Sequence, residues 1–193
     1  AGVGALLLFG AVQATMVGPG LERGDGLSHR QWLGLALAMG GLVALLLPGL
    51  GAPPPGSAAL MLAAGVGWGA YSLHGKKAVN AGAATAGNFV RAVPLAALLV
   101  AVSAPQWSFS RMGLVLALCS GAITSGLGYI VWYTVLPRLR SSAAATVQLS
   151  VPLLAALGGT LLLGEEWTQR LAWTGLAILG GIALVVMAPR RSV

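Results

Sequence analysis

The chain has 193 residues, of which 57% are hydrophobic and only 8% are charged, and its mean hydropathy is +0.86. Soluble domains carry about 25% charged residues, so this composition excludes an ordinary soluble enzyme and a disordered protein. The net charge of +7 does not indicate a nucleic-acid partner, because the basic residues lie in short gaps between apolar runs, as in membrane proteins. The single cysteine, Cys119, lies in an apolar stretch, so an intrachain disulfide is excluded.

Seven apolar stretches are long enough to cross a bilayer, which takes about 20 residues of helix. They show no two-residue alternation, and backbone groups in lipid must bond to one another, so we predict helices rather than barrel strands. Arg91 is the only full charge inside a stretch. The sequence therefore predicts an all-α integral membrane protein with about seven transmembrane helices. These are expected at 1–17, 31–48, 57–75, 86–104, 112–136, 142–163 and 172–188.

The basic residues are distributed unequally between alternate connections, which indicates orientation. One set of connections holds eight Lys and Arg residues, whereas the other holds only Arg111 and Arg170. This difference predicts a cytoplasmic C-terminus and an outward-facing loop at 105–111. The eight residues are Arg23, Arg30, Lys76, Lys77, Arg138, Arg140, Arg190 and Arg191.

Two distant segments resemble each other at a constant offset of 141 residues (173 − 32). QWLGLALAMGGLVALLLP begins at residue 31, and AWTGLAILGGIALVVMAP begins at residue 172. Shared Gly- and Ala-rich composition is the simpler explanation, but the common Trp-x-Gly-Leu-Ala start and final proline favour a duplication. Residues 57–189 are then a complete five-helix repeat, and 1–48 are the last two helices of a first, truncated repeat. The matched pairs are Trp32–Trp173, Gly34–Gly175, Leu35–Leu176, Ala36–Ala177, Gly40–Gly181 and Pro48–Pro189.

On this interpretation the intact protein has ten helices, and three of them, about 85–95 residues, precede the given N-terminus. Because five is odd, the two copies face opposite ways across the membrane, which is the inverted-repeat (5+5) architecture of secondary transporters.

Several segments follow a known family pattern in order. They are the repeat pair itself, GVGWGAYSLHGKKA at 65–78, and the stretch 129–166, where an aromatic helix end, a basic turn, a small-residue helix with Pro152 and a Gly-Glu close succeed one another. The chain thus resembles the EamA-type members of the drug/metabolite transporter superfamily, although GPGLERGDG at 18–26 departs from the Gly-Glu pattern. The resemblance implies a bacterial inner-membrane carrier, often an exporter of amino acids or other small metabolites, with ten helices and cytoplasmic termini.

Arg91 is the strongest candidate for contact with a solute, because a charge inside a span is expensive and usually faces a cavity or a partner. Asn88 lies three residues earlier, hence on the same helical face, and the pair offers donors to a carboxylate or phosphate. Two alternatives stay open: Arg91 extends to the lipid headgroups, or it makes a structural bond between helices.

Aromatic and hydroxyl groups form two further stripes that would line a mixed apolar and polar pocket. Trp68 and Tyr71 share one helical face, and Ser125, Tyr129 and Trp132 share another. The competing explanation is anchoring at the membrane interface, where Trp and Tyr are enriched. We assign Tyr133 and His74 to that interfacial role.

Prolines inside two spans predict kinks, because proline removes a backbone hydrogen bond. Pro94 lies in the fourth span and Pro152 in the sixth, where Gln148 is a further candidate for solute contact. Three small-residue motifs are interpreted as close-packing contacts between helices. Glu165 is interpreted as a helix cap, with cation binding as the alternative. The motifs are Ala36-x-x-x-Gly40, Ala177-x-x-x-Gly181 and Gly65-x-x-x-Gly69.

The sequence contains no clustered Cys and His, no phosphate-binding Gly-rich loop and no pair of carboxylates within a span. We therefore expect no enzyme activity, no cofactor and no metal, but a carrier of small metabolites that works by alternating access. A non-transporting membrane scaffold or assembly component is the alternative. The expected partners are a small solute and membrane lipid, and a homodimer is left open.

Overall fold

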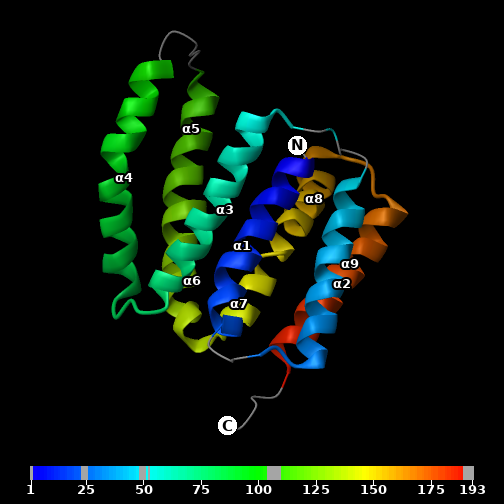
Figure 1. The fold of residues 1–193 in the computed structure, drawn as a ribbon. Coiled ribbons are helices and arrows are strands. Elements are labelled where there is room, and N and C mark those ends of the chain that lie inside the picture. The colour runs from blue at the N-terminus through cyan, green and yellow to red at the C-terminus, as the bar shows by residue number, and fades with distance from the viewer. Residues whose placement is uncertain (1, 23–25, 48–50, 52, 104–109, 189–193) are drawn as a thin grey trace. The chain divides into compact units, whose positions relative to one another are not determined.

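A computed structural model describes residues 2–22, 26–47, 51, 53–103 and 110–188, and the regular elements in these ranges are helices, without a strand (Figure 1). The all-helical prediction is therefore confirmed for the described part. The matched prolines Pro48 and Pro189, the acid Asp25 and most of the predicted outer loop 105–111 lie outside the described residues.

Each predicted span coincides with a helix or with a run of consecutive helices. The fifth span comprises four short elements, including a π-helix, and the sixth is broken into α7 and α8. The elements are α1 Gly2–Glu22, α2 His29–Leu46, α3 Pro55–Gly75, α4 Ala81–Ser103, α5 Arg111–Cys119, η3 Ser120–Leu127, α6 Gly128–Val135, η4 Leu136–Arg138, α7 Ser141–Val147, α8 Ser150–Leu163 and α9 Gln169–Val186.

Four helical stretches in the described part are long and apolar enough to cross a membrane, namely Ala81–Ser103, Arg111–Arg138, Ser141–Leu163 and Gln169–Val186. α1 contains a shorter apolar helix, Val3–Pro19. The chain is thus a multi-pass, all-helical membrane protein, whereas the number of seven spans stays a prediction.

Hydroxyl side chains begin the two helices that carry the similar segments. Ser28 and Gln31 form a reciprocal capping box at the start of α2, with Ser28 N–H donating to Gln31 Oε1 at 2.9 Å. Thr168 accepts a bond from Leu171 N–H at 3.2 Å at the start of α9. The predicted cap Glu165 is therefore wrong, because Thr168 occupies the position from which a side chain reaches the first free N–H groups.

The end of α8 explains why Gly164 is followed by Glu165 in the sequence. Gly164 has a φ of +70°, in the left-handed region that terminates helices and favours glycine. Glu165 then folds back, its N–H donating to Gly159 O at 3.3 Å and its carboxylate lying where a Cβ on Gly159 would be. Both glycines are therefore needed for this turn.

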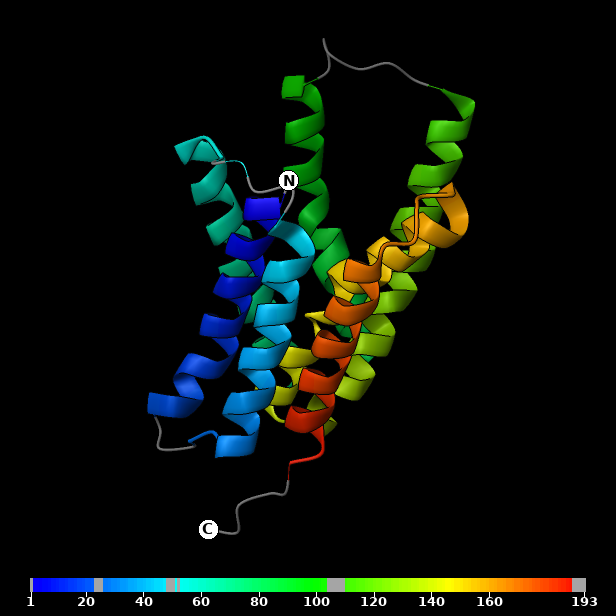
Figure 2. The same ribbon diagram turned by 90° about the vertical axis from the view of Figure 1, so that its right-hand side faces the viewer.

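The chain divides into two compact units. The first unit comprises Ala1–Leu73 and Leu139–Val193, and in it α2 and α9 run antiparallel, side by side (Figures 1 and 2). Their backbones approach closely at Gly34, since a Cβ there would lie 2.6 Å from Gly181 O. The buried core of this unit is continuous across several helices; its members are Phe9, Ala38, Leu42, Leu149, Leu153, Leu171 and Ile178.

The predicted close-packing motifs have mixed outcomes. Gly65 and Gly69 lie against α1, where added Cβ atoms would meet Leu8 O and the Thr15 side chain, so this motif is confirmed. Gly181 is also confirmed. The α2 motif is wrong, because Gly40 has nothing within 4 Å and Ala36 is exposed. α2 instead packs against α9 through a different face, which carries Gly34, Ala38 and Gly41.

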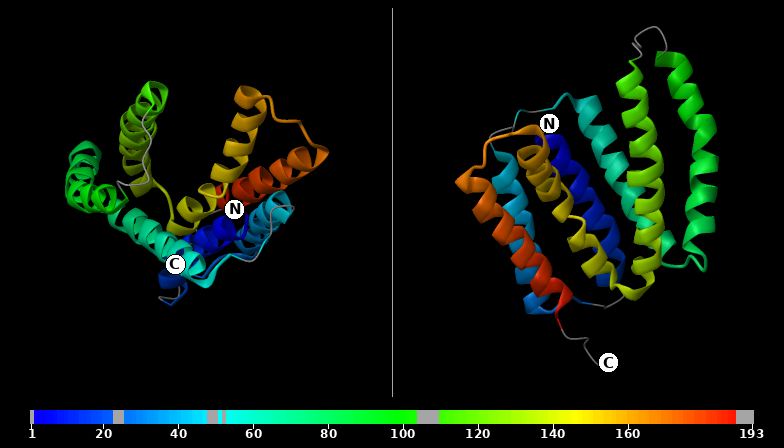
Figure 3. Two further views of the ribbon diagram at one scale, coloured as in Figure 1. Left: turned by 90° about the horizontal axis from the view of Figure 1, so that it is seen from above. Right: turned by 180° about the vertical axis from the view of Figure 1, so that it is seen from behind.

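The second unit, His74–Arg138, contains α4 and the run from α5 to η4, which form an antiparallel pair (Figure 3, right). Contacts between the two concentrate near the start of α4 and the end of the run, at α6. The apolar side chains from Val90 to Val102 on α4 are exposed, as expected of a surface that faces lipid.

Candidate functional site

The predicted site residues are divided between the two units. Asn88, Arg91, Pro94, Ser125 and Tyr129 belong to the second unit, and Trp68, Tyr71, Gln148 and Pro152 belong to the first. The site residues thus form two partial clusters, one in each unit, and the predicted single pocket stays a prediction.

Arg91 is exposed on α4, and its guanidinium folds back along its own helix. Nη1 lies 3.1 Å from the position that a Cβ on Gly87 would occupy, so the glycine leaves room for it. Among the described residues Arg91 has no hydrogen-bond or ion-pair partner, so the structural bond between helices is not made there. The guanidinium is therefore available to a solute or to lipid headgroups.

Asn88 is half-buried, and its Nδ2 donates to the hydroxyl oxygen of Tyr133 on α6 at 3.4 Å. Tyr133 is only 3% exposed, and its ring lies against Gly75. The interfacial role predicted for Tyr133 is therefore wrong, because the small Gly75 lets the ring pack inside this unit. Its spacing of four residues from Tyr129 is the signal that places both on one face of α6.

Thr85 is a further polar residue that sequence reasoning missed. It lies one turn before Asn88, is 2% exposed, and its hydroxyl has no hydrogen-bond partner in the described structure. A hydroxyl in an otherwise apolar helix gives only a weak sequence signal, since Thr commonly bonds to its own helix. Here it does not, which leaves a polar group next to the Asn88–Tyr133 pair.

The predicted stripe on the fifth span is interrupted by the π-helix η3. Ser125 lies in η3, whereas Tyr129 and Trp132 lie in α6, and all three are half-buried. Tyr129 packs edge-on against Phe89 of α4, with ring centroids 6.3 Å apart. π-Helical turns are rare and often occur at functional sites, so η3 remains a candidate for contact with a solute.

Trp68 is half-buried in the first unit. Its ring packs against Phe9 of α1 with centroids 5.7 Å apart, and it borders the buried core. Tyr71, one turn later on α3, is half-buried. Trp68 thus contributes to the packing between α1 and α3, a role that the sequence stripe does not reveal.

Pro94 and Pro152 differ in their effects. α4 continues through Pro94 without interruption. One turn before Pro152 the helix is broken, and Gln148 and Leu149 separate α7 from α8. Since Pro152 has no N–H, Gln148 O accepts instead from Val151 N–H at 3.1 Å, in a tighter turn. At the position of the predicted kink, Gln148 and Leu149 thus form a tightened turn that separates α7 from α8.

Side chains donate hydrogen bonds to three carbonyl groups of α7 at this break. Gln148 Nε2 donates to Ala144 O at 3.2 Å, and Ser150 Oγ donates to Val147 O at 2.8 Å. Gln13 of α1 donates from Nε2 to Ala145 O at 2.7 Å. Gln13 was missed because it lies 132 residues away from Ala145; a lone amide in an apolar span was the available signal.

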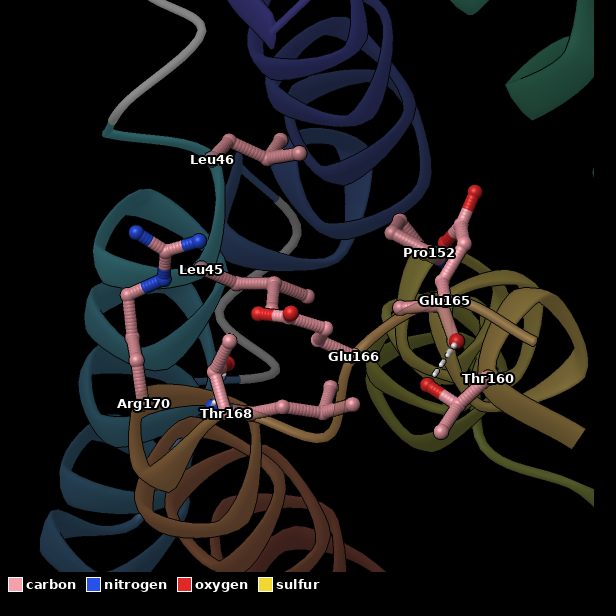
Figure 4. A pocket seen from close by; sticks show the side chains of 10 residues that line it. Leu45, Leu46, Pro152, Thr160, Glu165, Glu166, Thr168 and Arg170 are labelled. Atoms are coloured by element: carbon pink, nitrogen blue, oxygen red, sulfur yellow. Dashed lines mark hydrogen bonds between the residues drawn. The ribbon is translucent and has the colours of Figure 1, made fainter.

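A cavity of about 220 Å³ lies beside the connection between α8 and α9 (Figure 4). Glu165, Glu166 and Arg170 bring charges of both signs to it, and all three are exposed. The other lining residues are Leu45, Leu46, Pro152, Ala156, Thr160, Thr168 and Leu171. The cavity is open and its charges are solvated, which makes it a weaker candidate than the buried helix break.

Few charged groups occur elsewhere in the described part. Burial lowers the pKa of Lys76, in the turn between α3 and α4, because desolvation disfavours the ammonium. Within the described ranges no three His, Cys, Asp or Glu side chains are grouped to hold a metal ion.

The sequence of the chain matches a known protein family. The model of the EamA-like transporter family matches residues 56–187, from the start of α3 to the end of α9. The uncharacterized protein PA1977 of Pseudomonas aeruginosa is 55% identical over 190 residues, which are 98% of this chain and 66% of that protein.

Two further relatives are named threonine/homoserine exporter RhtA. The Salmonella typhimurium protein is 34% identical over 66% of this chain and 42% of its own length. The Escherichia coli K12 protein is 35% identical over 57% of this chain and 38% of its own length. The chain thus matches less than two thirds of the length of these relatives. No solved structure matches. The family model covers more than half of the chain, and the chain belongs to the EamA-like transporter family.

Proposed function

We propose that the protein is a secondary transporter of the bacterial inner membrane that moves small metabolites, such as amino acids or related compounds, by alternating access. The observation that carries this proposal is the family membership, together with similarity to proteins named as threonine/homoserine exporters. An apolar helix broken at Gln148 and Leu149 supports it, because discontinuous helices form the binding sites of many secondary transporters.

The proposed architecture is an inverted repeat, with 57–189 as one complete copy and 1–48 as the last two helices of the other. The antiparallel packing of α2 against α9 supports it, since these helices carry the two similar segments. The matched residues Trp32 and Trp173 are both exposed, 48% and 64% respectively. The glycine contact is less symmetric, because it pairs Gly34 with Gly181 and leaves Gly40 open.

In this proposal Arg91 and Asn88 hold the acidic group of the solute. Arg91 lacks a partner among the described residues, and the Asn88 amide retains a second N–H beyond its bond to Tyr133. Guanidinium and amide donors on one helical face suit a carboxylate. Ser125 and Tyr129, which belong to the same unit, are proposed to contact the remainder of the solute.

The C-terminus is proposed to be cytoplasmic, on the distribution of Lys and Arg. We propose no catalytic step and no cofactor, so transport is driven by gradients of solutes or ions.

Export by cells tests this function. The complete reading frame is expressed in a bacterium that lacks its own threonine and homoserine exporters, and efflux of radiolabelled threonine, homoserine and a panel of other amino acids is followed after preloading. Faster efflux of at least one compound than from cells with empty vector is expected. An Arg91→Ala variant present at the same membrane level serves as the matched control and should lose this gain. Equal efflux with and without the protein for every metabolite in the panel contradicts the proposal.

A further inference from the structure

The break between α7 and α8 presents a group of oxygen atoms deep inside the first unit. Gln13 and Gln148 are 7% and 5% exposed, and they lie on neighbouring carbonyl groups of α7, those of Ala145 and Ala144. The Oε1 atoms of both side chains have no hydrogen-bond partner in the described structure. Two buried amide oxygens therefore lie unpaired beside one helix break.

The orientation of both amides follows from their donors. Gln13 Nε2 donates to Ala145 O at 2.7 Å, and Gln148 Nε2 donates to Ala144 O at 3.2 Å and contacts Met16 Sδ at 3.1 Å. Exchanging N and O in either amide would set two oxygens against each other, so the assignment is fixed by the network. Each Oε1 consequently remains an acceptor. A buried acceptor without a donor or a cation is unfavourable, which indicates that something binds these oxygens.

The chemistry of the group selects the ligand. All of its oxygens are neutral, because they belong to amides and backbone carbonyls. The acids of this unit whose side chains are described, Glu165 and Glu166, follow the opposite end of α8. Mg²⁺ and Ca²⁺ rely on carboxylate ligands, and a metabolite is too large for side chains this deeply buried. Carbonyl groups at the ends of broken membrane helices are established ligands of small monovalent cations.

We propose that Gln13 and Gln148 hold a small monovalent cation, Na⁺ or K⁺, at the break between α7 and α8, with their Oε1 atoms as ligands and the carbonyl oxygens at the end of α7 completing its shell. Ala144 O and Val147 O each retain a lone pair beyond their side-chain bond, whereas Ala145 O already accepts from both Gln13 Nε2 and Gln148 N–H. Because Gln13 belongs to α1 and Gln148 to the break, the ion links two helices. Its use as a driving ion rests on the proposed transport function, whereas its binding does not.

Binding of ²²Na⁺ to the purified full-length protein tests this site. We expect saturable binding that K⁺ competes with and choline does not, and a melting temperature that rises with the concentration of the bound cation. Gln13→Leu and Gln148→Leu should each weaken binding at least tenfold. Thr146→Val is the matched control, since the Thr146 hydroxyl is buried beside the break but donates to Ser142 O within its own helix; it should bind normally.

Gln13→Lys separates the ligand role from the structural one. A lysine keeps a donor for Ala145 O but removes the amide oxygen and places an ammonium where we place the cation. This variant should stay folded, bind no ²²Na⁺ and show a melting temperature independent of Na⁺ and K⁺, even if the leucine variants fail to fold.

Absence of saturable ²²Na⁺ binding and of any cation effect on the parent's melting temperature overturns the proposal, and the oxygens are then bonded to water. Binding retained in Gln13→Lys overturns it as well. Metabolite efflux by the parent, measured separately, distinguishes failure of the cation site from failure of the proposed transport function.

Discussion

Replacing Gly181 by alanine should separate α2 from α9. A Cβ on Gly181 would lie 2.6 Å from Ala38 N and would overlap Gly34 O, whereas ordinary van der Waals contact begins at 3.4 Å. The helices must therefore move by at least about 0.8 Å (3.4 − 2.6), because the atoms in the way are backbone and cannot rotate aside. A gap of that size forfeits a quarter to a half of the dispersion energy of each contact.

The expected loss of stability is about 2 kcal/mol, within the range of about 1–3 kcal/mol for overpacked sites. Gly180→Ala provides the matched control, since a Cβ on Gly180 meets nothing within 4 Å. That variant should be as stable as the parent, or more stable by up to about 0.5–1 kcal/mol because alanine favours helix. Combining Gly34→Ala with Gly181→Ala should cost less than the sum of both, because the first substitution already separates the helices.

The assay is reversible unfolding of the purified full-length protein in mixed micelles with increasing denaturing detergent, followed by circular dichroism. Each variant is compared with the parent at the same total detergent concentration. Gly181→Ala and Gly180→Ala agreeing within about 0.5 kcal/mol would refute the close approach of α2 and α9.

Three other outcomes are expected. Arg91→Lys should reduce transport several-fold at an unchanged membrane level, since lysine keeps the charge but loses the planar two-pronged donor; flux equal to the parent's contradicts a role in binding. Tyr133→Phe should lower the unfolding free energy by about 0.5–1.5 kcal/mol, because it removes the hydroxyl that accepts from Asn88 of α4. Gly164→Ala should lower it by about 1–2 kcal/mol, because alanine is strained in the left-handed backbone conformation. An unfolding transition within error of the parent's contradicts the hydrogen bond in the first case and the left-handed conformation in the second. In a cysteine-free background, Glu166→Cys should react with an impermeant reagent on intact cells and Lys77→Cys only after permeabilisation, and the reverse pattern inverts the proposed orientation.

The buried polar contacts show where sequence reasoning ends. Gln148 stands out because it lies one turn before a proline, and its neighbourhood is predictable from the chain alone. Its companion Gln13 lies 132 residues from the carbonyl to which it donates, and nothing local to residue 13 indicates which helix it meets. Tyr133 is similar: its position near a helix end favours an interfacial role, but the absence of a side chain at Gly75 lets its ring be buried.

The sequence by itself determined the helical segments, an irregularity at Pro152 and the family, because a helix in lipid satisfies its own backbone and its length and kinks are properties of consecutive residues. The tertiary structure decided which face of each helix is used. Gly34 and Gly181, rather than Gly40, allow α2 and α9 to approach, and the amides of Gln13 and Gln148 donate to neighbouring carbonyl groups of α7. Such choices depend on the complementary shapes of two distant segments, and a pattern of small residues on one helix does not contain the surface against which it packs.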